Sequence, residues 1–149
     1  MAAAFDHLAP HGTLMQFYTL PTIRASIKLS QNDPAGAVRL LEPARDYELT
    51  DASGFNSVYP AYIRGLAYLK LGQGDAAAHE FQKLIDHPAI VGRDVIGALA
   101  HLQMGRAQAM SGNRDAARGS YQDFLKIWKD ADPDIPIYKQ AKAEYASLL

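Results

Sequence analysis

Residues 61–85 read AYIRGLAYLKLGQGDAAAHEFQKLI. On either side of the turn at Gly72–Gln73–Gly74, apolar side chains recur three and four positions apart. This spacing is the pattern of two amphipathic helices. Glycine tolerates the left-handed backbone that ends a helix, so the central turn is expected to be tight. Shifting the chain by 40 residues in either direction reproduces the arrangement, which predicts three helical hairpins.

Small residues recur at fixed places in the three units. One lies in the middle of each predicted first helix, a second follows twelve positions later, and a bulky residue comes four positions after that. Small side chains at these points let antiparallel helices approach closely, and the bulky side chain fills the gap to the next unit. The aligned sets are Ala25, Gly65 and Gly105; Ala37, Ala77 and Ala117; Leu41, Phe81 and Tyr121; and, at the turn, Asn32, Gly72 and Gly112.

This order of residues resembles that of tetratricopeptide repeats. The resemblance implies an all-α fold, a TPR-like α-solenoid of three helical hairpins with a C-terminal capping helix. The usual period of the family is about 34 residues, and we place the additional residues in connectors around 46–56 and 86–93. A HEAT-type array has a period near 40 and is the alternative fold, but it does not imply the observed order of small, turn and aromatic residues.

We expect a single domain over residues 1–149. The predicted boundaries are a lead-in from a truncated preceding repeat at 1–17, repeats at 18–56, 57–96 and 97–133, and a capping helix at 134–149. The lead-in either begins the first helix early or forms a short helix that is broken at Pro21.

The predicted capping helix is amphipathic. Asp134 is expected to cap it, and Pro136 suits its first turn. One face would cover the last hairpin, and the opposite face would meet solvent. The covering face carries Ile137, Ala141, Tyr145 and Leu148, and the solvent face carries Lys139, Lys142 and Glu144.

Composition excludes several classes of function. The net charge of −1 argues against binding to nucleic acid or to an anionic membrane through bulk charge. The absence of cysteine excludes disulfides, thiolate metal sites and a cysteine nucleophile. The chain contains no signal peptide pattern and no apolar run of spanning length. The compartment stays open: cytoplasmic by default, extracytoplasmic if the parent protein is anchored in a membrane.

No motif in the sequence has the surroundings that its chemistry requires. Residues 72–77 approximate a dinucleotide-binding loop, but they follow a predicted helix instead of a strand. Residues 130–134 begin like a calcium loop, but Ile135 and Ala141 occupy the positions that need Gly and Glu. His79 and Glu80 begin like a zincin helix, but Lys83 replaces the second histidine. We therefore predict no cofactor, no metal site and no enzymatic activity.

The resemblance to tetratricopeptide repeats also implies a concave groove lined by the first helices. Some members of the family clamp a C-terminal carboxylate with Lys and Asn at set positions. Those positions hold Thr22, Ser26 and Ile63 here, so that clamp is missing. The candidate partner groove consists of Tyr59, Tyr62, Leu66, Lys70, Leu102, Arg106 and Met110, and the family's remaining groove positions fall on Thr19, Thr22, Ser26, Ser30 and Leu99.

A narrower resemblance covers the second and third units. Residues 57–65, 96–102 and 128–134 resemble the C-terminal repeat region of bacterial eukaryotic-like Ser/Thr protein kinases and of some winged-helix regulators. The Gly-rich loop, HRD and DFG motifs of a kinase are missing, so the resemblance implies a bacterial signalling protein as the parent and no activity of this segment. We expect the segment to be the non-catalytic part of that parent that binds a protein or peptide. Two alternatives stay open: self-association into a homodimer that dimerises the parent protein, and sensing of a small ligand. An apolar end near Leu14–Leu20 would also promote association, as an artefact.

Overall fold

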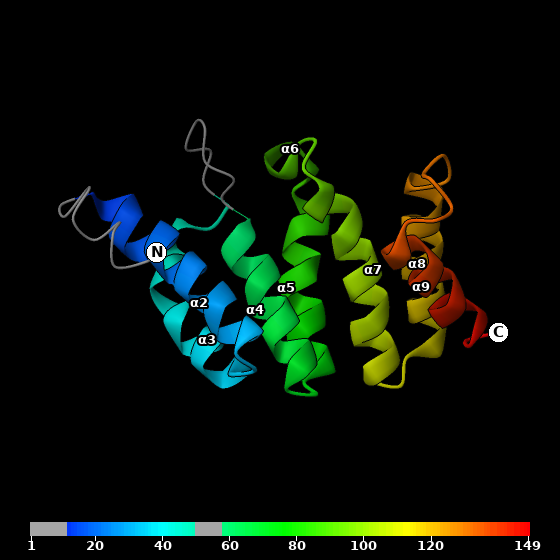
Figure 1. Ribbon diagram of the computed structural model, residues 1–149, viewed down its shortest axis with the longest axis horizontal. Coiled ribbons are helices and arrows are strands. Elements are labelled where there is room, and N and C mark those ends of the chain that lie inside the picture. Colours follow the sequence, from blue (N-terminus) through cyan, green and yellow to red (C-terminus); the bar gives the residue numbers. More distant parts are fainter. Residues whose placement is uncertain (1–11, 50–57) are drawn as a thin grey trace.

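The computed structural model describes residues 12–49 and 58–149, and throughout these ranges the regular structure is helical, with no strand. Figure 1 shows the helices standing side by side along the molecule. The elements are η1 (Met15–Thr19, a π-helical turn), α2 (Leu20–Ser30), α3 (Pro34–Leu40), η2 (Glu42–Tyr47, a 3₁₀ helix), α4 (Tyr59–Lys70), α5 (Gly74–Asp86), α6 (Pro88–Val91), α7 (Val95–Met110), α8 (Arg114–Ile127) and α9 (Pro136–Ala146).

Three short turns of the same geometry connect α2 to α3, α4 to α5 and α7 to α8. Asn32, Gly72 and Gly112 lie at equivalent positions in these turns and have φ values of 59°, 72° and 80°. In each turn the next residue's N–H donates to a carbonyl five positions earlier at 2.9 Å, which is a Schellman-type helix end. The prediction that these three residues share one turn position is confirmed.

The small residues of the first helices lie against the bulky residues of the second helices. A Cβ atom added to Gly65 would lie 2.6 Å from the Phe81 ring, and one added to Gly105 would lie 2.8 Å from the Tyr121 ring. In the first pair, Ala25 and Leu41 are both fully buried. Helix α4 therefore packs on α5, and α7 on α8, at a distance that no larger side chain would permit.

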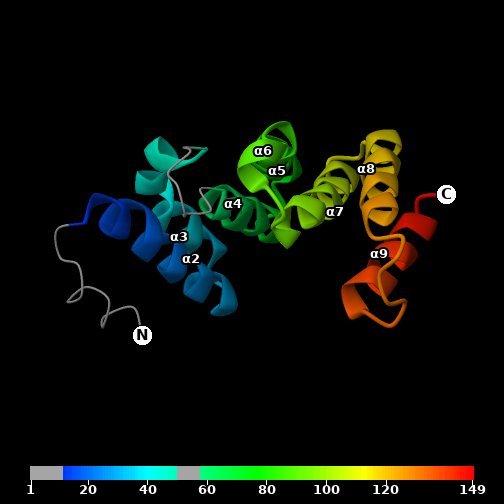
Figure 2. The ribbon, with the colours of Figure 1, turned by 90° about the horizontal axis from the view of Figure 1, so that it is seen from above.

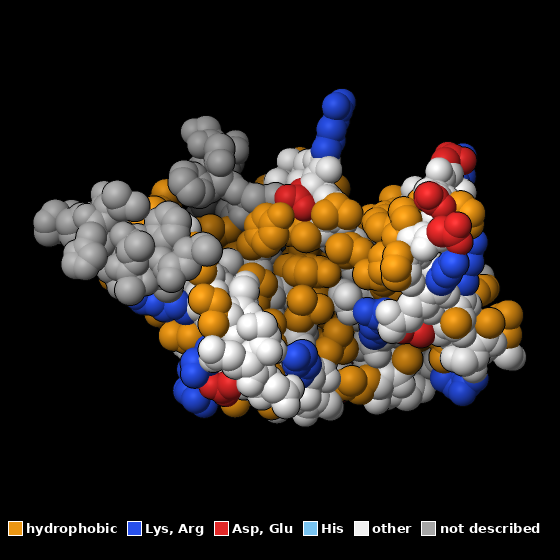
Figure 3. All heavy atoms as spheres, in the orientation of Figure 1, with side chains coloured by type: hydrophobic (Ala, Val, Ile, Leu, Met, Phe, Trp, Pro, Cys, Tyr) orange, Lys and Arg blue, Asp and Glu red, His pale blue; other side chains and the backbone are white. Residues whose placement is uncertain are grey.

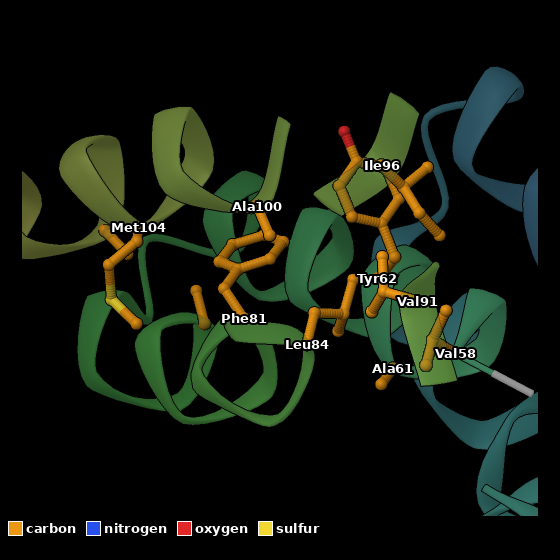
Figure 4. Packing of buried hydrophobic residues seen from close by; sticks show 11 residues of the cluster. Val58, Ala61, Tyr62, Phe81, Leu84, Val91, Ile96, Ala100 and Met104 are labelled. Atoms are coloured by element: carbon orange, nitrogen blue, oxygen red, sulfur yellow. The ribbon is translucent and has the colours of Figure 1, made fainter. Parts of the chain in front are cut away.

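Successive helix pairs also pack on one another through a continuous core. Figure 4 shows the middle of this core, where Phe81 of α5 lies beneath Ala100 of α7 and Tyr62 of α4 lies beside Ile96. Seen from above in Figure 2, α2, α4, α7 and α9 follow one face of the molecule, which is concave, while α5 and α8 lie behind it.

Of the two forms expected for the N-terminal lead-in, the structure shows the one in which the first helix begins early. Residues 1–11 of the predicted lead-in, and 50–56 of the first predicted repeat, lie outside the described residues. From Met15 the helix runs without a break through Pro21, which has no N–H to donate. The π-helical turn η1 lies just before this proline and continues directly into α2. Pro21 therefore does not divide the segment into two helices.

The last helix covers the end of the core, with two corrections. Tyr138, Ala141 and Leu148 are buried against α7 and α8. The residue that precedes α9 is Ile135, so the prediction that Asp134 caps the helix is wrong. Glu144 is also not on the solvent side as predicted, because its carboxylate turns inward and accepts hydrogen bonds from Arg106 and Tyr121.

Candidate functional site

The concave face is built by the first helices of each pair, and α4 supplies the centre of its floor. Tyr59 is 37% exposed at the start of α4, and Lys70 is exposed at its end. Leu66 lies between them and is partly buried, in contact with two adjoining core clusters. Figure 3 shows hydrophobic side chains gathered in the middle of this face, over α4 and α7 and up to α9.

Tyr62 belongs more to the core than to the surface. Only 9% of the residue is exposed, and its ring meets the Phe81 ring edge-on, with the centroids 5.8 Å apart. Burial raises the pKa of the Tyr62 hydroxyl above its usual value. Tyr62 therefore supports the concave face from within and leaves little of its own surface exposed.

Tyr59 connects the beginnings of two first helices. Its hydroxyl donates to Oδ2 of Asp94 at 3.0 Å, and Oδ1 of Asp94 accepts the N–H of Ile96 as the cap of α7. The tyrosine ring is thereby held at the upper edge of the concave face while much of its surface stays exposed. Rigid, partly exposed tyrosines of this kind bind partners at a low cost in conformational entropy.

On α2 the predicted groove positions carry hydroxyl groups that are already engaged. Thr22 donates to the carbonyl of Tyr18 at 2.5 Å, Ser26 to that of Thr22 at 3.1 Å, and Ser30 to that of Ile27 at 2.7 Å. The fourth predicted position, Thr19, lies on η1 and is half-buried, and its Oγ1 atom has no hydrogen-bond partner among the described residues. Because the three donors of α2 are satisfied within their own helix, α2 offers weak polar anchors beside the apolar floor of α4.

On α7 two predicted groove positions face the capping helix instead. Leu102 is fully buried among Tyr121, Phe124 and Tyr138, so its assignment to an open groove is wrong. Arg106 donates to both carboxylate oxygens of Glu144, at 2.9 and 3.0 Å. The physical reason is the position of α9, whose residues Tyr138 and Ala141 pack in the same buried cluster as Leu102.

Three other predicted positions keep at least part of their surface exposed. Leu99 is partly buried between two core clusters, and Met110 is 47% exposed at the end of α7. The Lys70 ammonium donates to the carbonyl of Leu29 at 3.0 Å, and none of the described residues forms an ion pair with it. Of the two cations expected at the groove, Lys70 is the one whose charge is not neutralised by a neighbouring carboxylate.

A buried ion cluster beneath α4 was not predicted from the sequence. Arg64 is fully buried, and its Nη2 atom lies 2.5 Å from Glu48 and 2.8 Å from Glu80. Burial opposes ionisation of Glu80, but hydrogen bonds from Arg64 and Lys83 outweigh it and hold the pKa of this carboxyl below its usual value. The cluster joins the segment after η2 to α4 and α5, and so fixes the back of the groove floor.

Metal-holding clusters and membrane-spanning helices are both absent from the described residues. Within 12–49 and 58–149, no three histidine or acidic side chains converge in a way that could hold a metal ion. Over the same ranges, no helix has the length and apolar character needed to cross a bilayer. No protein-family model matches the sequence, and a search of curated proteins returns no match.

Proposed function

We propose that this chain is a non-catalytic binding module of the TPR-like solenoid class, with three helical hairpins and α9 as its cap. The repeated turns at Asn32, Gly72 and Gly112 support this assignment, as do the contacts of Gly65 with Phe81 and of Gly105 with Tyr121. Its role is to hold a peptide or a partner helix against the concave face. The resemblance of residues 57–65, 96–102 and 128–134 to the repeat region of bacterial Ser/Thr kinases supports a role within a bacterial signalling protein.

The observation that carries the proposal is the apolar floor of the concave face. Tyr59, Leu66 and Leu99 present partly exposed apolar surface there, between the polar hydroxyls of α2 and the cap α9. Exposed apolar surface rimmed by polar groups is typical of a protein interaction site. Helix α7 supports this interpretation because exposed apolar side chains remain at its two ends, where Val95 is 54% and Met110 is 47% exposed.

The electrostatics of the face define the partner further. Arg106 is paired with the carboxylate of Glu144, whereas no carboxylate of the described residues pairs with Lys70 at the lower end of the floor. The partner is therefore a segment with apolar side chains at helical or alternating spacing, followed by an acidic group that reaches Lys70. An amphipathic helix or an extended peptide satisfies this description.

A peptide-display selection against the folded chain tests the proposal. We expect selected peptides to combine apolar residues with an acidic residue, and to bind Lys70→Glu at least about fivefold more weakly than the wild type. The matched control is Lys126→Glu, an equal charge reversal at an exposed position of α8 behind the groove. Equal losses in both variants, or selected peptides that are basic, would contradict the proposal.

Self-association is the competing outcome and has its own readout. Phe17 and Ile27, on the first helical segment, are 43% and 39% exposed. If a second copy is the natural partner, light scattering would show a dimer that Phe17→Ser and Ile27→Ser dissociate, while selected peptides would leave it intact.

A further inference from the structure

A second concave feature lies on the opposite side of α7 from the groove. It is a cleft of about 540 Å³ between the end of α5, the single-turn helix α6, the beginning of α7 and the end of α8. Figure 2 looks down on the end of the molecule where these segments meet. This volume is in the range of small-molecule sites. The walls are mainly apolar, and include Leu84, Ile85, Val91, Val95, Ala98, Ile127 and Trp128.

The cleft exists because α6 is inserted between two helix pairs. Gly92 ends α6 with a φ of 61°, a conformation that suits glycine, and the chain turns there toward α7. Gly97 then lets α7 approach α6 so closely that a Cβ atom would lie 2.8 Å from Val91. The resulting wall of α6 faces Trp128, which is held in place by Phe124 with a ring-centroid distance of 5.0 Å.

The rim of the cleft carries one cation that is open to a ligand. Arg93 lies there, is exposed, and forms no ion pair with any of the described residues. Asp94 also lines the cleft, but both of its carboxylate oxygens accept hydrogen bonds, from the N–H of Ile96 and from the Tyr59 hydroxyl, so Arg93 is the charged group left to pair with a ligand. His101 also lines the cleft, with Nδ1 3.9 Å from Asp123.

We propose that this cleft binds a small amphiphilic anion, a carboxylate with an aromatic or medium-length aliphatic body. The apolar body lies against Val91, Ile127 and Trp128, and the carboxylate pairs with Arg93. This site is separate from the concave face, so the inference does not depend on the peptide-binding function.

Trp128 makes the test direct, since it is the single tryptophan of the chain. Three ligands of equal chain length serve as probes: decanoate, decanol and decyltrimethylammonium. We expect decanoate to change Trp128 fluorescence with a saturable dependence on concentration, decanol to bind about fivefold more weakly, and the cationic probe to bind weakest.

Variants of the cleft separate specific binding from general surface adsorption. Arg93→Gln should weaken decanoate by about fivefold and leave decanol unchanged. Ile127→Asp, at a position that is 54% exposed, should weaken decanoate without affecting the fold. Ala98→Phe should fill the cleft and abolish binding of both ligands, with retained helicity checked by circular dichroism. Arg118→Gln, at a partly exposed arginine of α8 outside the cleft, is the matched control.

Three results would overturn the proposal. The first is that no ligand changes the Trp128 fluorescence below its micelle-forming concentration. The second is that neither Arg93→Gln nor Ile127→Asp alters the affinity for decanoate. The third is that the anionic and cationic probes bind with equal affinity.

Discussion

The Arg64 guanidinium lies 2.8 Å from the Glu80 carboxylate in the interior of the molecule, where Arg64 has no exposed surface. Glu48 accepts a second hydrogen bond from the same nitrogen at 2.5 Å. The three side chains link α4 and α5 to the segment that follows η2. A buried charge of this kind is tolerated because its partners are present, and becomes costly when one of them is removed.

Replacing Arg64 should therefore destabilise the fold more than any exposed ion pair can. Arg64→Met leaves Glu48 and Glu80 buried without their main partner, and we expect the free energy of unfolding to fall by about 3–5 kcal/mol. The control is Arg118→Met, which removes the exposed pair with Asp115 and should cost less than about 1 kcal/mol. Urea denaturation measures both. Equal costs would show that the buried cluster does not hold α4 and α5 together.

Acid should weaken the attachment of α9 through Glu144. Burial opposes ionisation of this carboxyl, but hydrogen bonds from Arg106 and Tyr121 outweigh it and keep the pKa of Glu144 below 4.5, its value in the unfolded chain. The folded state then binds the proton more weakly, so this contribution is present above about pH 4.5 and is lost as the pH falls through the lower folded value.

Denaturation of the wild type and of Glu144→Gln over a series of pH values tests this linkage. The wild type should lose stability more steeply than the variant below about pH 4.5, because the variant has no carboxyl to protonate. Parallel pH profiles would contradict the assignment of the pair Arg106–Glu144 as a stabilising contact.

Replacing glycine by alanine should change the free energy of unfolding in opposite directions at two sites, Gly65 and Gly119. Gly65→Ala places a methyl group 2.6 Å from the Phe81 ring, so α4 and α5 must separate, and we expect a loss of about 1–3 kcal/mol. At Gly119, in the interior of α8, nothing lies within 4 Å of the added Cβ. Gly119→Ala should therefore stabilise the protein by about 0.5–1 kcal/mol through helix propensity. Thermal unfolding of both variants gives the comparison, and a stabilising Gly65→Ala would refute the close-packing account.

The capping role of α9 can be tested by two alanines of the same helix. Ala141 is fully buried against α7 and α8, whereas Ala143 is exposed. Ala141→Glu should detach α9, expose the apolar surface beneath it, and produce oligomers in light scattering. Ala143→Glu should behave as the wild type. If Ala141→Glu stays monomeric and resists proteolysis like the control, α9 is not needed as a cover.

The sequence predicts features that depend on local chemistry better than those that depend on where distant segments meet. Asn32, Gly72 and Gly112 are recognisable as turns because a left-handed backbone favours these residue types. Leu102 was misassigned because its burial depends on the position of α9, which the spacing within α7 does not reveal. Arg64 was overlooked for the same reason, since its partners lie 16 positions away on either side.

The measurement that bears most directly on the concave face is the affinity of a display-selected peptide for two alanine variants. Leu66 lies in the floor of the proposed groove, and Ile127 is exposed on α8 behind it. Isothermal titration should show that Leu66→Ala weakens the peptide about tenfold, equivalent to about 1.4 kcal/mol, while Ile127→Ala stays within about twofold of the wild type. The opposite ranking, with both variants folded by circular dichroism, would contradict binding at the concave face.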